Sequence, residues 1–151
     1  MPIVTAADVA FETMHARDGE YLYRLCEATM RVYVETIWGS WNAAVAAEAL
    51  AKGASDGSFS SVMFNGVRAG AVSVERLDTH HQLEQLFIEP AFQNLGIGTA
   101  TVRSVIAEAQ REQKPVRLRV LASNPARLLY ERLGFVVTES TPQRHFMERH
   151  V

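Results

Sequence analysis

A glycine-containing turn between two predicted elements is the first feature of this sequence that could do chemistry. It reads Gln93-x-x-Gly96-x-Gly98, with an apolar, strand-like run before it and a helical pattern after it. A helix N-terminus has unpaired N–H groups and the positive end of the helix dipole, so it suits a phosphate or pyrophosphate. The glycines let the backbone approach such an anion closely, and Gln93 can reach back to fix the loop. The motif is not a P-loop, and it is not a dinucleotide fingerprint because Thr101 stands where that fingerprint has its third glycine. The alternative interpretation is that the two glycines only form a tight turn.

Hydrophobic periodicity predicts the elements that would position this turn. Apolar residues at steps of three and four predict a first helix ending at Gly39, and Ser40 is the expected cap of a second helix over residues 41–52. Asn65-Gly66 predicts a tight hairpin between strands at 60–64 and 67–75, because both residues tolerate positive φ. A short strand over 9–14, strands over 80–88, 116–120, 135–139 and 144–150, and helices after the glycine turn and over 126–133 complete the pattern. This order predicts a mixed α/β (α+β) fold around one sheet.

Composition narrows the class of protein. The 151 residues, 48% hydrophobic and 21% charged, indicate one ordered globular domain over residues 1–151. A formal net charge of −2 gives no reason to expect nucleic acid or an anionic membrane as a partner. The single cysteine excludes an internal disulfide and a cysteine-cluster metal site. Residues 1–18 lack a signal-peptide pattern and the apolar runs are short, so a cytoplasmic location away from membranes is expected.

Two separated stretches resemble a known family. Residues 83–98 form an apolar strand ending in Ile88-Glu89-Pro90, followed by the Gln/Arg-x-x-Gly-x-Gly/Ala pattern that opens a helix; this resembles the acetyl-CoA motif of the GNAT superfamily of N-acetyltransferases. Residues 124–135, with an Asn after a strand and a helical Tyr130 before Gly-Phe, are similar to its second signature. The resemblance implies a mostly antiparallel sheet flanked by helices on both faces. Asn94 and Leu95 stand where many relatives have arginine.

The resemblance also implies where the coenzyme would lie. Backbone groups of Phe87 and Ile88 would pair with the pantetheine arm as an added strand would. The side chain of Asn124 would reach the pantetheine or the thioester end. Backbone N–H groups of seven consecutive residues would hold the pyrophosphate: Gln93, Asn94, Leu95, Gly96, Ile97, Gly98 and Thr99.

Acetyl transfer to an amine needs a base, because a lysine-like amine titrates at about 10.4 and must lose its proton before it attacks. The resemblance makes Glu84 the candidate base, acting through a water, and Tyr130 the candidate acid that donates to the departing sulfur. A solvated Glu84 and a Tyr130 that only packs the helix are the structural alternatives. Strict alternation would put Glu84, Leu86 and Ile88 on one face of their strand. His80 and His81 are weaker candidate bases, and because no third ligand has a plausible spacing, no metal site is expected.

Aromatic residues concentrate in the first third of the chain, where the resemblance implies the acceptor lid. Tyr33, Trp38 and Trp41 together with Glu35 would suit a cationic amine through cation–π attraction and charge pairing. Tyr33 is also compatible with helix packing, and the two tryptophans lie at a helix break.

These observations predict an enzyme, an acetyl-CoA-dependent N-acetyltransferase acting by direct attack on a primary amine of a small cationic molecule. Two alternatives remain open: an acetyltransferase for protein lysines or N-termini, which would need an open groove, and a non-catalytic acyl-CoA-binding sensor or interaction module. The acceptor, the acyl chain length and a homodimer are left open by the sequence.

Overall fold

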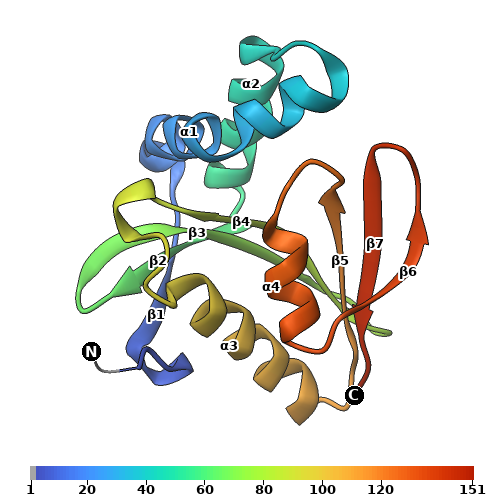
Figure 1. Cartoon of the computed structure of the whole chain (residues 1–151). Coiled ribbons are helices and arrows are strands. Elements are labelled where there is room, and N and C mark those ends of the chain that lie inside the picture. Colours follow the sequence, from blue (N-terminus) through green and yellow to red (C-terminus); the bar gives the residue numbers. More distant parts are fainter. Residues whose placement is uncertain (1–2) are drawn as a thin grey trace.

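A computed structural model describes residues 3–151 and contains one seven-stranded sheet in the order β1-β2-β3-β4-β5-β7-β6 (Figure 1). Neighbouring strands are antiparallel except β4 and β5, which are parallel. The strands are β1 Val9–Thr13, β2 Phe59–Phe64, β3 Val67–Arg76, β4 His81–Ile88, β5 Val116–Leu121, β6 Val136–Ser140 and β7 Arg144–Arg149. The helices are α1 Gly19–Trp38, α2 Ala43–Ser55, α3 Ile97–Arg111 and α4 Ala126–Arg132, with short 3₁₀ turns at Ala6–Asp8, Ala16–Asp18 and Pro90–Phe92. The mixed, mostly antiparallel fold predicted from the sequence is confirmed.

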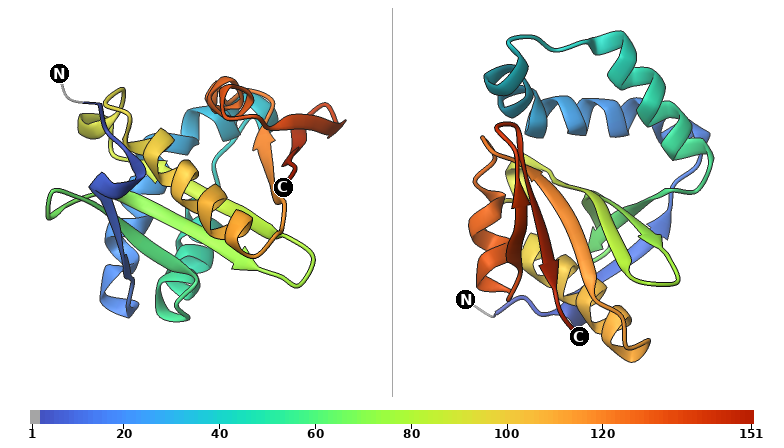
Figure 2. Two further views of the ribbon diagram at one scale, coloured as in Figure 1. Left: turned by 90° about the horizontal axis from the view of Figure 1, so that it is seen from below. Right: turned by 90° about the vertical axis from the view of Figure 1, so that its right-hand side faces the viewer.

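Helices cover both faces of the sheet (Figures 1 and 2), and each face has its own hydrophobic core. On one face α3 and α4 pack on the sheet through residues such as Ile97 of α3 and Tyr130 of α4. On the other face α1 and α2 pack through residues such as Leu22 and Leu50. Within residues 3–151 no helix has both the length and the hydropathy needed to cross a membrane.

Local backbone chemistry sets most element boundaries. Helix α1 ends where Gly39 adopts φ +80° and donates its N–H to the Glu35 carbonyl at 2.7 Å. The hairpin turn has φ +51° at Asn65 and +76° at Gly66, as predicted. The prediction that Ser40 caps the second helix is wrong, because the Asn42 side chain accepts from the Val45 N–H at 3.1 Å and α2 starts at Ala43. Trp41 therefore lies in the α1–α2 connection.

Strand β4 has a bulge at Glu84 that the sequence pattern did not reveal. On β3, Ser73 pairs with Gln85 and Val74 pairs with Leu83, which leaves Glu84 without a partner. The extra residue reverses the alternation of side chains. Leu83, Leu86 and Ile88 therefore all pack toward the α3 side, and the prediction that Glu84 shares a face with Leu86 and Ile88 is wrong.

Strands β4 and β5 pair only at their beginnings. The register joins His81–Leu83 to Val116–Leu118 and extends no further, although both strands continue. From Glu84 to Ile88 the edge of β4 that faces β5 therefore has no strand partner. This divergence leaves backbone groups free in the middle of the sheet, which is where a cavity forms.

Candidate active site

The larger of two adjoining cavities lies between the end of β4, the glycine turn and the helices α3 and α4, with a volume of about 490 Å³. The turn is held in place by the Gln93 side chain, whose Nε2 donates to the Ile88 carbonyl at 3.0 Å. Asn94 and Gly96 adopt positive φ values of +63° and +90°, which bend the chain sharply into α3. The role predicted for Gln93 in fixing the loop is thus confirmed.

The N-terminus of α3 faces this cavity. The first hydrogen bond around the helix runs from the Ala100 N–H to the Gly96 carbonyl at 2.9 Å, so the preceding N–H groups have no partner within the helix. Gly98 lines the cavity, and a Cβ placed there would lie 3.7 Å from the nearest atom, a carbon of Ile88. The protein therefore has room for a Cβ at residue 98, and a larger branched side chain would extend into the cavity. Free N–H groups, the helix dipole and a small side chain together form a cradle for an anion.

Most of the residues predicted to bind the coenzyme line this cavity. Leu95 and Ile97 do not line it. The Gln93 N–H donates to the Pro90 carbonyl at 3.3 Å, so this one of the seven predicted N–H groups is not free for a pyrophosphate. The predicted residues that line it are Phe87, Ile88, Gln93, Asn94, Gly96, Gly98, Thr99 and Asn124.

A smaller cavity of about 240 Å³ lies on the α1 side of the divergence between β4 and β5. It is lined by side chains of both tryptophans and of three charged residues, Glu84, Arg119 and Arg144. The two cavities share five lining residues: Met30, Leu86, Phe87, Asn124 and Tyr130. They therefore meet where β4 and β5 separate.

Tyr130 lies at this junction. Its ring packs edge-on against Phe135 with centroids 5.7 Å apart, and the residue is only 8% exposed. Burial raises the pKa of Tyr130 to about 12, and no hydrogen bond to another residue within 3–151 contributes to that shift. The phenol therefore keeps its proton at neutral pH and is available as a donor to a group in the junction.

Glu84 lies on β4 where the strands diverge, and Asn124 lies in the connection between β5 and α4. The bulge directs Glu84 into the smaller cavity, where its Oε2 lies 3.9 Å from an Nη of Arg119. The side-chain Oδ1 of Asn124 accepts from the Ala126 N–H at 2.9 Å and holds the start of α4. Its amide nitrogen lies 3.9 Å from the sulfur of Met30, which also lines both cavities.

The residues predicted to bind the acceptor divide into separate places. Trp38 and Trp41 line the smaller cavity, and the Trp41 Nε1 donates to the Tyr23 hydroxyl at 3.2 Å. Tyr33 lines the larger cavity instead. Glu35 lies outside both cavities, on the exposed side of α1, where it pairs with Arg31 at 3.1 Å.

Among the residues of the smaller cavity that sequence reasoning missed are its cysteine and both of its arginines: Cys26, Arg119 and Arg144. Arg119 alternates along β5 with the buried Leu118 and Val120, but this alternation does not indicate that α1 crosses above the face on which Arg119 lies. Burial raises the pKa of the Cys26 thiol to about 11, so it stays protonated at neutral pH. No local signal distinguishes Arg144 from an ordinary residue at the end of a hairpin.

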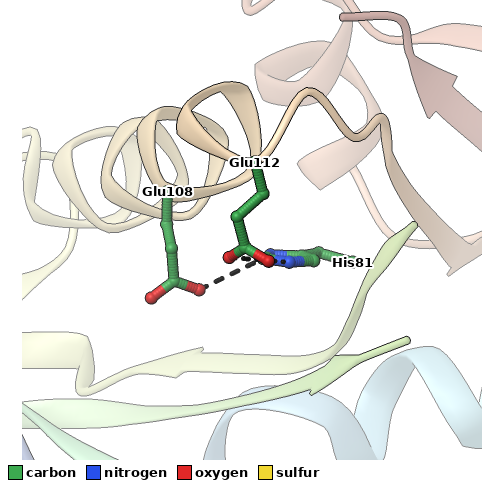
Figure 3. A group of neighbouring side chains, drawn as sticks. All are labelled: His81, Glu108 and Glu112. Carbon is green, nitrogen blue, oxygen red and sulfur yellow. Dashed lines mark ion pairs between the residues drawn. The ribbon is translucent and has the colours of Figure 1, made fainter. Parts of the chain in front are cut away.

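The structure also brings together His81, Glu108 and Glu112, with ligand-type atoms within 4.8 Å of one another (Figure 3). The sequence offered no third ligand beside the histidines because Glu108 lies on α3 and Glu112 is the C-cap residue of α3, both far along the chain from His81. The His81 Nδ1 lies 3.5 Å from Glu108 and its Nε2 lies 3.3 Å from Glu112, so each ring nitrogen faces a different carboxylate. Arg76 at 2.6 Å and Lys114 at 3.4 Å already balance those two carboxylates. We interpret the group as an ion-pair network between α3 and β4, and the lack of a resident metal stays a prediction.

Comparisons with known proteins agree with this geometry. The family model for the acetyltransferase (GNAT) domain matches residues 30–149. No curated protein sequence matches the chain. An acetyltransferase from Thermus thermophilus superposes with a TM-score of 0.74 at 15% identity, covering 100% of both chains. The PaiA N-acetyltransferase from Thermoplasma acidophilum, in complex with coenzyme A, gives 0.69 at 14% identity, covering 95% of this chain and 99% of that one. The ribosomal-protein-S18-alanine N-acetyltransferase from Escherichia coli gives 0.69 at 19% identity, covering 93% and 92%. At such identities these structures establish the fold.

Proposed function

Since the chain belongs to the GNAT acetyltransferase family, we propose that it transfers the acetyl group of acetyl-CoA to a primary amine of a small molecule. The observation that carries the proposal is the meeting of the two cavities at Tyr130, Asn124 and Leu86. One cavity has a cradle for phosphates, and the other is lined by aromatic and charged side chains. The proposed acetyl donor and acceptor would approach each other from opposite sides of the sheet at this junction.

The larger cavity is the proposed site of acetyl-CoA, which supplies the acetyl group as a thioester. The free N–H groups at the start of α3 would hold its pyrophosphate. The unpaired edge of β4 at Phe87 and Ile88 would hydrogen-bond its pantetheine arm as an added strand does. A free N–H near Ile88 would also polarise the thioester carbonyl. The presence of a coenzyme A complex among the structural relatives supports this use of the fold.

Glu84 is the proposed base. An amine that titrates at about 10.4 enters as an ammonium ion, so a base must remove one of its protons before direct attack. Glu84 is suited to this because the bulge directs it into the smaller cavity, with its side chain 29% exposed and in contact with solvent. Through a bound water it would accept the proton and pass it to solvent.

Tyr130 is proposed to act on the departing sulfur as a hydrogen-bond donor. An alkyl thiol titrates at about 8.5, whereas burial raises the pKa of Tyr130 to about 12. Complete proton transfer from the phenol to a thiolate is therefore uphill. The thiolate would leave hydrogen-bonded to Tyr130 as the C–S bond breaks, and it would take its proton from the nitrogen of the newly formed amide.

The size and walls of the smaller cavity favour a small acceptor over a protein. At about 240 Å³ it lies below the usual range of about 300–1,000 Å³ for ligand pockets. Trp38 and Trp41 would form aromatic walls around the acceptor, and the Glu84 carboxylate would attract the cationic form of the amine before it loses its proton. An extended polypeptide would need an open groove instead.

A screen of small amines with acetyl-CoA, monitored by release of free thiol, tests the proposal. We expect turnover with at least one class of small primary amine, and its loss in Gly98→Val, which blocks the phosphate cradle. Acetylation of peptides in preference to every small amine would favour the protein acetyltransferase. Tight acetyl-CoA binding without turnover on any amine would favour the non-catalytic acyl-CoA sensor.

A further inference from the structure

We propose that the acceptor amine also carries an oxyanion, a carboxylate or a phosphate, and that Arg144 binds it with help from Arg119. This inference rests on the proposed function, and it narrows the acceptor from amines in general to zwitterionic ones. The sequence predicted a cationic acceptor because Glu35 was expected in the pocket, but the structure places Glu35 outside it.

The charges in the smaller cavity carry the argument. Among its described lining residues one is acidic, Glu84, and two are basic, Arg119 and Arg144. Glu84 and Arg119 lie 3.9 Å apart and largely balance each other. Arg144 has no carboxylate within ion-pair distance among residues 3–151, so the cavity keeps one uncompensated positive charge. A diamine would place a second cation beside that charge, whereas a zwitterion would match Glu84 with its amine and Arg144 with its oxyanion.

Arg144 is held in position on both its backbone and its side chain. Its N–H donates to the Thr141 hydroxyl at 3.0 Å, and its carbonyl accepts from the Thr141 N–H at 2.8 Å. Its guanidinium carbon lies 5.2 Å from the centroid of the Trp38 ring, which restricts where the charge can move. Trp38 lines the same cavity and is 48% exposed. A guanidinium fixed in this way presents a planar pair of donors that fits a carboxylate or a phosphate.

Arg119 would add a second donor from the neighbouring strand on the same face of the sheet, because it lies two residues before Leu121, the β5 residue that pairs with Arg144. It follows Leu118, the last β5 residue paired with β4, so it lies where the two strands separate. Its side chain is 54% exposed, and its long contact with Glu84 leaves other donors of the guanidinium free. The coenzyme's own pyrophosphate has a separate site at the start of α3, on the other side of the junction. The two arginines are therefore available to the acceptor.

Matched acceptors test the inference. We would measure kcat/KM for amines of one chain length that end in a carboxylate, a phosphate, an uncharged amide or a second amine. The wild-type enzyme is expected to prefer one of the two oxyanions over the amide by about 10- to 100-fold, the usual value of a hydrogen bond to a charged group. Whichever anion is preferred identifies the group.

Arg144→Gln removes the charge and keeps a side chain that can hydrogen-bond. It should remove most of the preference for the anion, through a higher acceptor KM, and leave the KM of acetyl-CoA unchanged. Arg117→Gln is the matched control. Arg117 lies on the same face of β5 as Arg119, but it pairs with Glu148 and does not line the cavity. It should keep the wild-type preference.

The possible outcomes separate the two proposals. Equal or better turnover of the amide and the diamine, or equal effects of Arg144→Gln on all acceptors, would overturn the zwitterionic acceptor and leave the acetyltransferase standing. Absence of turnover with every amine, while acetyl-CoA still binds, would overturn the proposed function and this inference with it.

Discussion

Replacing Tyr130 with Phe separates its chemistry from its packing. The ring and its edge-on contact with Phe135 are kept, and only the hydroxyl is lost. A buried hydroxyl without a protein partner costs roughly 1–3 kcal/mol, and access to cavity water reduces that cost. We therefore expect the free energy of unfolding of Tyr130→Phe to be unchanged or higher by about 1 kcal/mol.

The expected effect on the rate is large and opposite in sign. Because the pKa of Tyr130 lies well above that of a thiol, the contribution proposed for Tyr130 is a hydrogen bond to developing charge. Such a bond is worth up to about 3 kcal/mol, which corresponds to a loss in kcat of roughly 100-fold. If Tyr130 served only to pack the core, the variant would keep its rate, because the ring that makes the packing contact is retained.

The assay is kcat at saturating acetyl-CoA, by thiol release, with thermal melting measured on the same sample. Tyr33→Phe is the matched control, since Tyr33 also lines the larger cavity but lies away from the junction with the smaller one. It should retain kcat within about threefold. A kcat of Tyr130→Phe within threefold of the wild type would remove Tyr130 from the mechanism and refute the reasoning from its position.

Four further results are expected. Gly98→Ala should fold and bind acetyl-CoA, because a Cβ at residue 98 lies 3.7 Å from its nearest neighbour. Gly98→Val should also fold, but its affinity for acetyl-CoA, measured by calorimetry, should fall at least about 100-fold. An unchanged affinity of Gly98→Val would exclude the phosphate cradle. Trp38→Ala should raise the acceptor KM at least about tenfold. Glu35→Gln alters a residue outside the cavity and should leave the KM of the acceptor and the KM of acetyl-CoA unchanged. Equal effects of the two variants would show that they act through α1 as a whole. Because the folded state holds the Tyr130 proton up to a pKa of about 12, the wild type should lose stability as the pH rises from 10 towards 12, and denaturant unfolding of Tyr130→Phe should show less of this loss. Chelator or added Zn²⁺ should move the melting temperature by less than about 1 °C, and a rise of several degrees that His81→Gln abolishes would reveal a metal site.

The parts of the site that depend on local backbone chemistry could be predicted from the sequence. The turn from Gln93 to Gly98 needs glycine at a positive φ, and a helix start always leaves N–H groups free, so both features follow from residues a few positions apart. The helix end at Gly39 and the hairpin at Asn65-Gly66 were predictable for the same reason.

A feature that involves only a few consecutive residues can still depend on a neighbouring element, and the sequence then does not predict it. The bulge at Glu84 exists because β3 pairs with both sides of it, and periodicity within β4 alone contains no information about that partner. The cap of α2 is Asn42 and not Ser40. Both residue types cap helices well and they stand only two positions apart, so the sequence did not distinguish them.

The sequence by itself determined the elements, their order and the anion cradle, because these follow from side-chain period and backbone conformation. Only the tertiary structure decided which side chains share a cavity. It placed Tyr130 where the two cavities meet and Arg144 against Trp38, and it put Glu35 on the outer side of its helix. Those placements depend on how strands β4 and β5 diverge and how α1 crosses above them. Such packing joins residues about a hundred positions apart, and no pattern within a single element encodes it.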